Sequence, residues 1–214
     1  MNKSERYPIA VMQAKITHLY RFHQKHGYLT TFAGFTMPLW YRGIIEEHLA
    51  VRNSAGLWDV SHMGRFSIMG KDATRFLEHL LIGSASFLPS GRAFYSLLCN
   101  ERGGIIDDVV TLKTDDEHYL MVGNASTRAK DFEWLSRHST PFSVTVKDVS
   151  DSIALLSLQG PKADQILRNL ADTNLSTLPR YHHTKATLNA LNVIISRTGY
   201  TGEDGFEIFV VECP

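Results

Sequence analysis

Residues 93–124 contain three apolar runs with a period of two, and this pattern constrains the fold more than any other part of the chain. The runs read AFYSLLCN, IIDDVVTLK and HYLMVGN, and the short segments ERGG and TDDE separate them. Alternating apolar residues bounded by turn residues are typical of β-strands, and short turns join antiparallel neighbours. The stretch therefore predicts a three-stranded antiparallel meander.

The segments around the meander change between helical and strand periodicity. Apolar residues at three-to-four spacing predict helices over residues 9–26, 44–53 and 72–82, with Gly27 as a C-terminal cap and Asp72 as an N-terminal cap. A further helix is expected over 126–138, and another after Gly160, with Pro161 at its first position. Strands are expected over 142–149 and 153–159, and across 186–211 around the turn RTGYTGEDG. Because strands mostly adjoin strands, with helices between the groups, the pattern favours an α+β fold over a doubly wound parallel sheet.

Composition excludes several classes of function. The chain has 214 residues, of which 43% are hydrophobic, and its 22 basic residues balance its 22 acidic ones. This balance gives no overall bias toward nucleic acid or an anionic membrane. The N-terminus has no unbroken apolar segment of a signal peptide, and no apolar run is long enough to span a membrane. We therefore expect a cytoplasmic protein, or an organellar matrix protein whose targeting peptide was removed.

Two adjacent carboxylates, Asp107 and Asp108, interrupt the second strand of the meander. Successive side chains of a strand point to opposite faces, so the two cannot form a side-by-side pair. Asp108 shares its face with Ile106, Val110 and Leu112, whereas the face of Asp107 leads to Thr111 and Lys113 and is expected to be partly wet. A buried carboxylate needs hydrogen-bond donors, so Asp108 either ties down a neighbouring loop or faces a cavity that receives a polar ligand.

A second carboxylate has the same unusual setting. Glu207 shares a strand face with Phe209 and Val211 in GFEIFVV. The preceding segment RTGYTGEDG surrounds Tyr200 with glycines, so its ring either packs on a flat ligand or closes a hairpin over the core.

Other chemical motifs are absent or weak. The glycines of RTGYTGEDG have the wrong spacing for a dinucleotide fingerprint, and Gly70-Lys71 lacks the rest of a phosphate loop. The pairs His182-His183 and His23-x-x-His26 have no companions at coordinating spacing, and neither do Cys99 and Cys213, so no metal site is expected. The segment DVSHMG contains the residue types of a hydrolase triad, but sequence neighbours seldom form one, and a structured turn is expected there.

Five collinear segments resemble the signature segments of the glycine cleavage system T proteins, the aminomethyltransferases. They are FAGFTMPLWY at 32–41, AVRNSAGLWDVSHMG at 50–64, FYSLLCNERGGIIDDVV at 94–110, SLQGPKA at 157–163 and SRTGYTGEDGFE at 196–207. Five blocks in one order are far more specific than any single motif, and they cover nearly the whole chain from about residue 17.

The resemblance implies an activity and a set of site residues. It implies that tetrahydrofolate is a co-substrate, without a metal, and that the partner is a lipoylated H protein carrying an aminomethyl group. The methylene group passes to tetrahydrofolate and ammonia is released. Asp108 matches the family's conserved acid, and Glu207 and Tyr200 match folate-contacting residues. Further pocket positions fall on Tyr95, Met63, Val110, Asn124 and Tyr181.

The resemblance also implies the domain organisation. We expect residues 1–58 and 153–214 to form a discontinuous first domain, incomplete at its C-terminal end, and 59–152 to form an inserted antiparallel α+β domain. Full-length members continue past the last residue here with a GxRD segment and a C-terminal β-barrel, so a C-terminally truncated T protein is expected. Two alternatives stay open, namely a folate-binding or scaffold protein without transferase activity and an inactive fragment. Iron–sulfur assembly relatives carry the motif KGCxxGQE, which is absent here.

Overall fold

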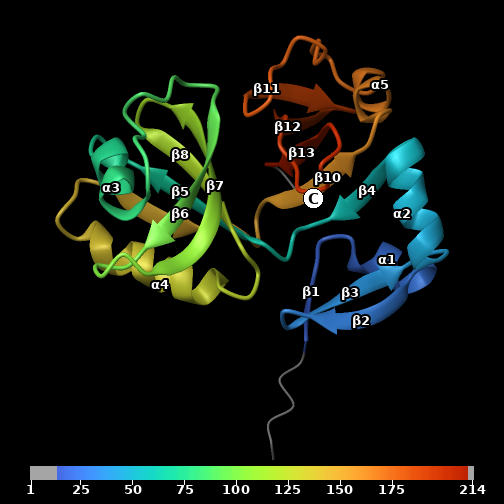
Figure 1. Cartoon of the computed structure of the whole chain (residues 1–214), viewed down its shortest axis with the longest axis horizontal. Helices are drawn as coiled ribbons and strands as arrows, with labels where there is room; N and C mark the ends of the chain where they lie inside the picture. The colour runs from blue at the N-terminus through green and yellow to red at the C-terminus, as the bar shows by residue number, and fades with distance from the viewer. Residues whose placement is uncertain (1–13, 212–214) are drawn as a thin grey trace, which may run out of the picture.

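A computed structural model describes residues 14–211, which form three β-sheets and five helices (Figure 1). The strands are β1 (Lys15–Ile16), β2 (Tyr28–Phe32), β3 (Phe35–Trp40), β4 (Gly56–Asp59), β5 (Gly64–Met69), β6 (Ala93–Cys99), β7 (Ile105–Asp115), β8 (His118–Gly123), β9 (Thr145–Asp148), β10 (Ala154–Gln159), β11 (His183–Leu188), β12 (Leu191–Ser196) and β13 (Gly205–Val210). The helices are α1 (Tyr20–His26), α2 (Ile44–Asn53), α3 (Ala73–Leu80), α4 (Arg128–Ser139) and α5 (Ala163–Arg168). In this part of the chain no helix is long and apolar enough to cross a membrane.

The predicted α+β fold with antiparallel sheets is confirmed. The meander forms as expected, with β6 antiparallel to β7 and β7 antiparallel to β8. Strands β5 and β9 complete this five-stranded sheet, in the order β6-β7-β8-β5-β9. Helices α3 and α4 cover one face of it, where Phe76, Leu77 and Leu135 pack with Phe66 and Val109 in a fully buried core.

The second five-stranded sheet has the order β11-β12-β13-β10-β4 and is antiparallel throughout. Helix α5 covers it through Ala163 and Leu167, which pack on Ile195 and Phe206. The helix begins at Ala163 rather than at Pro161, because the chain first turns sharply at Gly160, whose φ is 130°. A Cβ at Gly160 would lie 2.6 Å from the carbonyl oxygen of Ser54, so only glycine fits this close approach.

The N-terminal helix is shorter than its periodicity predicted. Residues 9–13 lie outside the described residues, and Lys15–Ile16 pair with β3 as a short parallel strand. Helix α1 therefore begins only at Tyr20. Gly27 ends the helix as expected, with its N–H donating to the His23 carbonyl oxygen at 2.8 Å, but in an extended conformation with φ −114°.

Helix α2 has the predicted bounds, yet its apolar face is exposed. Glu47 accepts hydrogen bonds from the N–H groups of Tyr41 and Arg42 at 2.6 Å, which ties the turn before the helix to its first turn. Ile45 is 76% exposed and Leu49 50% exposed, and Val51 is the residue of this helix that is buried. The apolar spacing thus located the helix without telling which face meets the core.

The two five-stranded sheets share a third core. Leu112, Leu120 and Val122 of one sheet pack with Leu155 and Phe209 of the other. We propose that the two sheets correspond to the predicted division into 1–58 with 153–214 and the inserted segment 59–152. The alternation of the strands supports it, because β4 and β10–β13 lie in one sheet and β5–β9 in the other (Figure 1).

Both connections between the sheets meet at Arg65, which is fully buried. Its guanidinium donates to the carbonyl oxygens of Ser61 and Met63 in the first connection and of Ser150 in the second. Burial is the largest cause that lowers the pKa of Arg65, to about 10, followed by the charge of Arg128. This side chain holds the two connections together, and with them the relative position of the sheets.

Candidate functional site

A cavity of about 640 Å³ lies between the two five-stranded sheets. Its lining includes all eight residues predicted for the site, which come from distant parts of the sequence: Met63, Tyr95, Asp108, Val110, Asn124, Tyr181, Tyr200 and Glu207. The lining contains two carboxylates and, among the described residues, no lysine, arginine or histidine. Such a cavity suits a ligand that is rich in hydrogen-bond donors or carries developing positive charge.

The two neighbouring aspartates have the reverse of their expected burial. Their side chains do point to opposite faces, but Asp107 is 7% exposed and Asp108 is only partly buried, facing the cavity. The prediction that Asp107 is partly wet is wrong, because helices α3 and α4 cover its face and bury Val109 and Thr111 as well. Asp108 instead faces the other sheet, so its apolar neighbours line the cavity and the core between the sheets.

Asn124 joins the two aspartates at the end of β8. Its side-chain Nδ2 donates to Asp107 Oδ1 and to Asp108 Oδ1, both at 2.9 Å. Its backbone N–H donates to Asp107 Oδ2 at 2.8 Å, and Thr127 Oγ1 donates to the same oxygen at 2.8 Å. These donors outweigh burial and lower the pKa of Asp107. The buried aspartate is therefore an ionised anchor for Asn124, which in turn holds the carboxylate of Asp108 at the cavity wall.

Glu207 lies across the cavity, on β13. Its Oε2 accepts a hydrogen bond from Thr198 Oγ1, and Oε1 has no donor among the described residues. Burial raises the pKa of Glu207, and the hydrogen bond from Thr198 offsets this only in part. The structure thus holds a carboxylate with one unpaired oxygen, in a place where ionisation is unfavourable until a ligand supplies donors.

The loop between β12 and β13 carries Tyr200 at the cavity mouth. The predicted positive-φ character is found at Gly202, where φ is 81°. Arg52 of α2 holds the loop by donating to the Thr201 carbonyl oxygen at 2.8 Å and to Glu203 at 2.9 Å. The Tyr200 side chain itself is 95% exposed, so it does not close a hairpin over the core as one interpretation of the sequence expected.

Two further tyrosines stand at the mouth, with Tyr95 53% and Tyr181 43% exposed. Desolvation, followed by the nearby carboxylate of Asp108, raises the pKa of Tyr95. Tyr181 has a positive φ of 56°, which is uncommon for a residue with a side chain. Its carbonyl oxygen accepts from the Ala93 N–H of β6, and its N–H donates to the carbonyl oxygen of Arg197, directly after β12. Three aromatic rings therefore surround the opening and offer flat surfaces to a planar ligand.

Sequence reasoning missed four polar or aromatic residues of the lining, Trp58, Ser157, Thr198 and Thr201. Trp58 and Ser157 lie opposite each other on β4 and β10, and Ser157 is also the register partner of Glu207. The pairing register could have found Ser157 only if the order of the strands were known. Trp58 stands in a short edge strand, and although it lies in the signature segment 50–64, no periodicity there distinguishes it from its neighbours.

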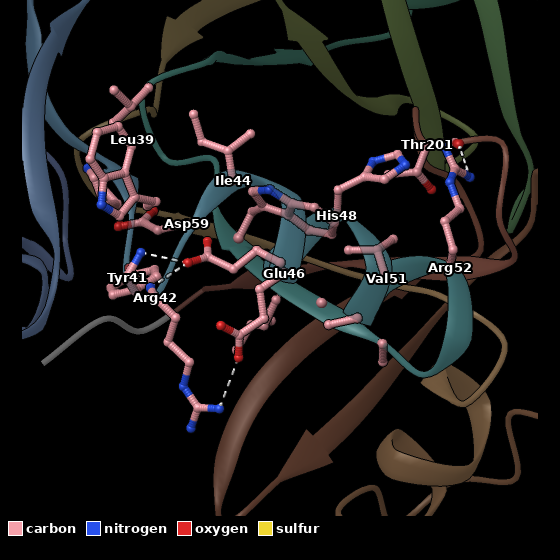
Figure 2. A pocket seen from close by; sticks show the side chains of 18 of the residues that line it. Leu39, Tyr41, Arg42, Ile44, Glu46, His48, Val51, Arg52, Asp59 and Thr201 are labelled. Atoms are coloured by element: carbon pink, nitrogen blue, oxygen red, sulfur yellow. Dashed lines mark hydrogen bonds and ion pairs between the residues drawn. The ribbon is translucent and has the colours of Figure 1, made fainter.

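A second hollow of about 660 Å³ lies on the other side of Tyr200 and Thr201, which line both. Figure 2 shows its wall from α2, with Ile44, His48 and Val51, and the segment around Leu39 and Tyr41. Its charged side chains largely have partners, since Glu47 accepts from backbone N–H groups of the turn before α2 and Arg42 pairs with Glu46 at 3.5 Å. Despite partial burial, hydrogen-bond donors lower the pKa of Glu47 and of Asp59 in this hollow, whereas burial raises the pKa of Glu207. The cavity between the sheets is therefore the better candidate for a donor-rich ligand.

The histidines do not form a metal centre in the described part of the chain, where no group of three ligating side chains is found. His23 is instead a buried structural residue, with Nε2 2.9 Å from Asp59 Oδ2 and Nδ1 2.7 Å from the Tyr41 hydroxyl. Asp59 also accepts from Ser61 N–H at 2.9 Å, which gives DVSHMG the structured turn that was predicted.

Comparison with known proteins assigns most of the chain to the family that its signature segments resemble. Residues 19–212 match the GCVT N-terminal domain family. Curated relatives named aminomethyltransferase include those of Alkaliphilus metalliredigens, 45% identical over 199 residues, and Thermotoga maritima, 45% identical over 197. Each alignment covers 92% of this chain and 54% of the relative, so the chain spans about half the length of the curated relatives it matches.

Solved structures agree with these relatives. The glycine cleavage system aminomethyltransferase T from Bartonella henselae superposes with a TM-score of 0.85 and 36% identity, covering 92% of this chain and 54% of that one. A heterotetrameric sarcosine oxidase from Corynebacterium sp. U-96 shares the fold, with a TM-score of 0.57 and 16% identity over 77% of this chain and 81% of that one. Because the family match extends over most of the sequence and the structural agreement is close, the chain belongs to the GCVT N-terminal domain family of the aminomethyltransferases.

Proposed function

We propose that this chain carries the tetrahydrofolate site of a glycine cleavage aminomethyltransferase. The observation that supports it is the cavity between the sheets, with Asp108 and Glu207 contributed by different sheets and no basic side chain in the described lining. In such a site the co-substrate supplies the amine that accepts a methylene group. The protein supplies orientation, exclusion of water and stabilisation of positive charge.

Glu207 binds the pterin ring of the co-substrate in this proposal. An amino-pyrimidinone edge presents neighbouring donors, which a carboxylate binds with two parallel hydrogen bonds. The unpaired Oε1 and the raised pKa of Glu207 fit this role, because such donors would complete its hydrogen bonds and favour its charged form. The rings of Tyr95, Tyr181 and Tyr200 lie where they would cover the faces of the bound ring system.

Asp108 stabilises the reacting nitrogens in this proposal. Positive charge develops when ammonia leaves the aminomethyl group, and a carboxylate held beside it lowers the energy of that state. Asn124 Nδ2 holds Asp108 Oδ1, and the Tyr95 hydroxyl stands beside the same carboxylate. The carboxylate still has lone pairs to orient a folate amine or to accept a proton. Met63 and Val110 supply apolar surface at this end of the cavity.

The partner in this proposal is a lipoylated H protein, whose long arm brings the aminomethyl group to the cavity mouth. Nucleic acid, membrane and metal have no place in the proposed reaction. The predicted cytoplasmic location stays a prediction.

The test has two stages. Tetrahydrofolate is titrated into the protein by calorimetry, and ammonia release is then measured with aminomethylated H protein. Binding and ammonia release together support the transferase. Binding without ammonia release supports a folate-binding protein of the same fold, and absence of binding refutes the assignment of the cavity.

A further inference from the structure

Asp131 of α4 places a second buried carboxyl group beside Asp107. Its residue is fully buried, and neither Oδ1 nor Oδ2 accepts a hydrogen bond from a described donor. A Cβ built on Gly123 would lie 3.1 Å from Asp131 Oδ2 and 3.3 Å from Asp107 Oδ2, so both carboxyl groups lie next to the same glycine. Two adjacent buried carboxyl groups cannot both ionise without a large cost, and one of them must keep a proton.

The donors decide which of the two keeps it. Asp107 receives the N–H and Nδ2 groups of Asn124 and the hydroxyl of Thr127, which favour its charged form. Lys130, whose charge acts on Asp131, donates instead to the Ile106 carbonyl oxygen at 2.7 Å. The hydroxyl of Thr127 also lies near Asp131, but its single hydrogen is donated to Asp107 at 2.8 Å. Asp131 therefore satisfies its buried oxygens by carrying a hydrogen and donating it to Asp107.

Resting on the proposed function of the cavity, we propose that Asp131 is a positioning residue of the site: it shares one hydrogen with Asp107, and this pair fixes Asn124 and, through it, Asp108. The path is continuous, since Asn124 Nδ2 lies 2.9 Å from Oδ1 of Asp107 and 2.9 Å from Oδ1 of Asp108. It reaches from helix α4 through the sheet to the cavity wall.

The pair makes the site sensitive to pH. Burial, followed by the hydrogen bond and charge of Asp107, raises the pKa of Asp131 to about 7, while the hydroxyl of Thr127 and the charge of Lys130 oppose this. Below that pH the pair holds one negative charge. Above it a second charge appears beside the first, the shared hydrogen is lost, and repulsion loosens Asp107 from Asn124. Binding of tetrahydrofolate therefore weakens as pH rises through about 7.

The experiment compares Asp131→Ala, Asp131→Asn and a control on the same helix, Glu133→Gln, whose carboxylate is exposed and pairs with Arg137. Tetrahydrofolate affinity is measured by calorimetry from about pH 5.5 to about 8.5. Asp131→Ala should weaken binding by roughly 10-fold, because Asp107 loses a donor in a buried network. Asp131→Asn supplies an amide donor that does not titrate, so it should restore affinity to within ~3-fold of wild type and remove the weakening near neutral pH. Glu133→Gln should behave as wild type.

Carbon-13 NMR of the carboxyl carbons gives an independent readout. One aspartate carboxyl should titrate near pH 7 in wild type and in Glu207→Gln, and this signal should vanish in Asp131→Asn.

If no aspartate titrates there, the shared hydrogen is refuted even if tetrahydrofolate binds normally. If one does and Asp131→Asn keeps the wild-type pH profile of binding, the link to Asp108 is refuted. Failure of wild type to bind tetrahydrofolate at every pH would count against the proposed function, while the titration still decides the pair. Should Asp131→Asn not fold, Asp107→Asn assigns the signal instead, since a neutral partner shifts it to lower pH.

Discussion

Replacing Glu207 by glutamine should weaken ligand binding and stabilise the fold at the same time. The carboxylate has one hydrogen bond, from Thr198, and lies where burial raises its pKa. A glutamine of the same shape keeps a partner for the Thr198 hydroxyl and removes the cost of placing a charge there. It cannot, however, accept two parallel hydrogen bonds from a donor-rich ligand.

The pH dependence follows from the direction of the pKa shift. The folded-state pKa of Glu207 lies above its ordinary value of 4.5, so folding favours the protonated form. Its contribution to stability is fully present below pH 4.5 and is lost as pH rises through the folded-state value. The variant has no such loss. The two proteins should therefore be equally stable in acid and should separate as the pH becomes neutral.

The magnitudes are large enough to measure. An incompletely paired buried charge costs about 1–3 kcal/mol. In a protein of this size 1 kcal/mol corresponds to a change in Tm of about 2–4 °C. Calorimetric scans should show Glu207→Gln melting several degrees higher at pH 8 and unchanged at pH 4, and its tetrahydrofolate affinity should fall by roughly 10- to 100-fold. Glu117→Gln, at an exposed turn, is the matched control. A variant that melts lower than wild type at pH 8, or one that binds tetrahydrofolate as tightly, would refute the reasoning.

Three further substitutions test other parts of the structure. Asp108→Asn should lower the rate of ammonia release by on the order of 10²-fold while tetrahydrofolate affinity falls less, and near-normal turnover in an active preparation would contradict its role. Arg52→Ala releases the loop around Tyr200, so hydrogen exchange over residues 197–204 should increase and tetrahydrofolate affinity should fall roughly 3- to 10-fold, with Tm changed by no more than about 2 °C because the ion pair is partly exposed. Arg65→Leu leaves buried carbonyl oxygens of both inter-sheet connections without donors and should lower the Tm by about 5–10 °C in a calorimetric scan, whereas an unchanged Tm would show that the connections hold without it.

Local sequence patterns predicted most helices and strands, because alternation and turn residues directly reflect the geometry of a single element. The alternation in residues 93–124 requires strands, and the short turns between them require antiparallel pairing, so β6, β7 and β8 form as expected. Helix α2 likewise has its predicted bounds. The first helix was predicted too long because Ile16 continues its apolar spacing, but pairing of Lys15 and Ile16 with β3 outweighs helical propensity there.

The candidate site shows more clearly which features the sequence specifies and which depend on packing. Alternation alone determined that Asp107 and Asp108 face opposite ways, and the signature blocks of the sequence singled out Asp108 and Glu207. Which aspartate is buried could not be read from the strand, because burial depends on the elements that pack on each face. Only the packing of α3 and α4 decided that Asp107 belongs to the interior, beside Asp131 of α4.

The sequence by itself determined the antiparallel meander through its periodicity and indicated the family through five collinear segments, because both can be read along the chain. Tertiary structure alone decided that two carboxylates from different sheets line one cavity without a counter-ion among the described residues, and that a buried pair of aspartates stands behind one of them. The physical reason is that burial and donor supply belong to the space between elements, and the order of residues along one strand does not specify that space.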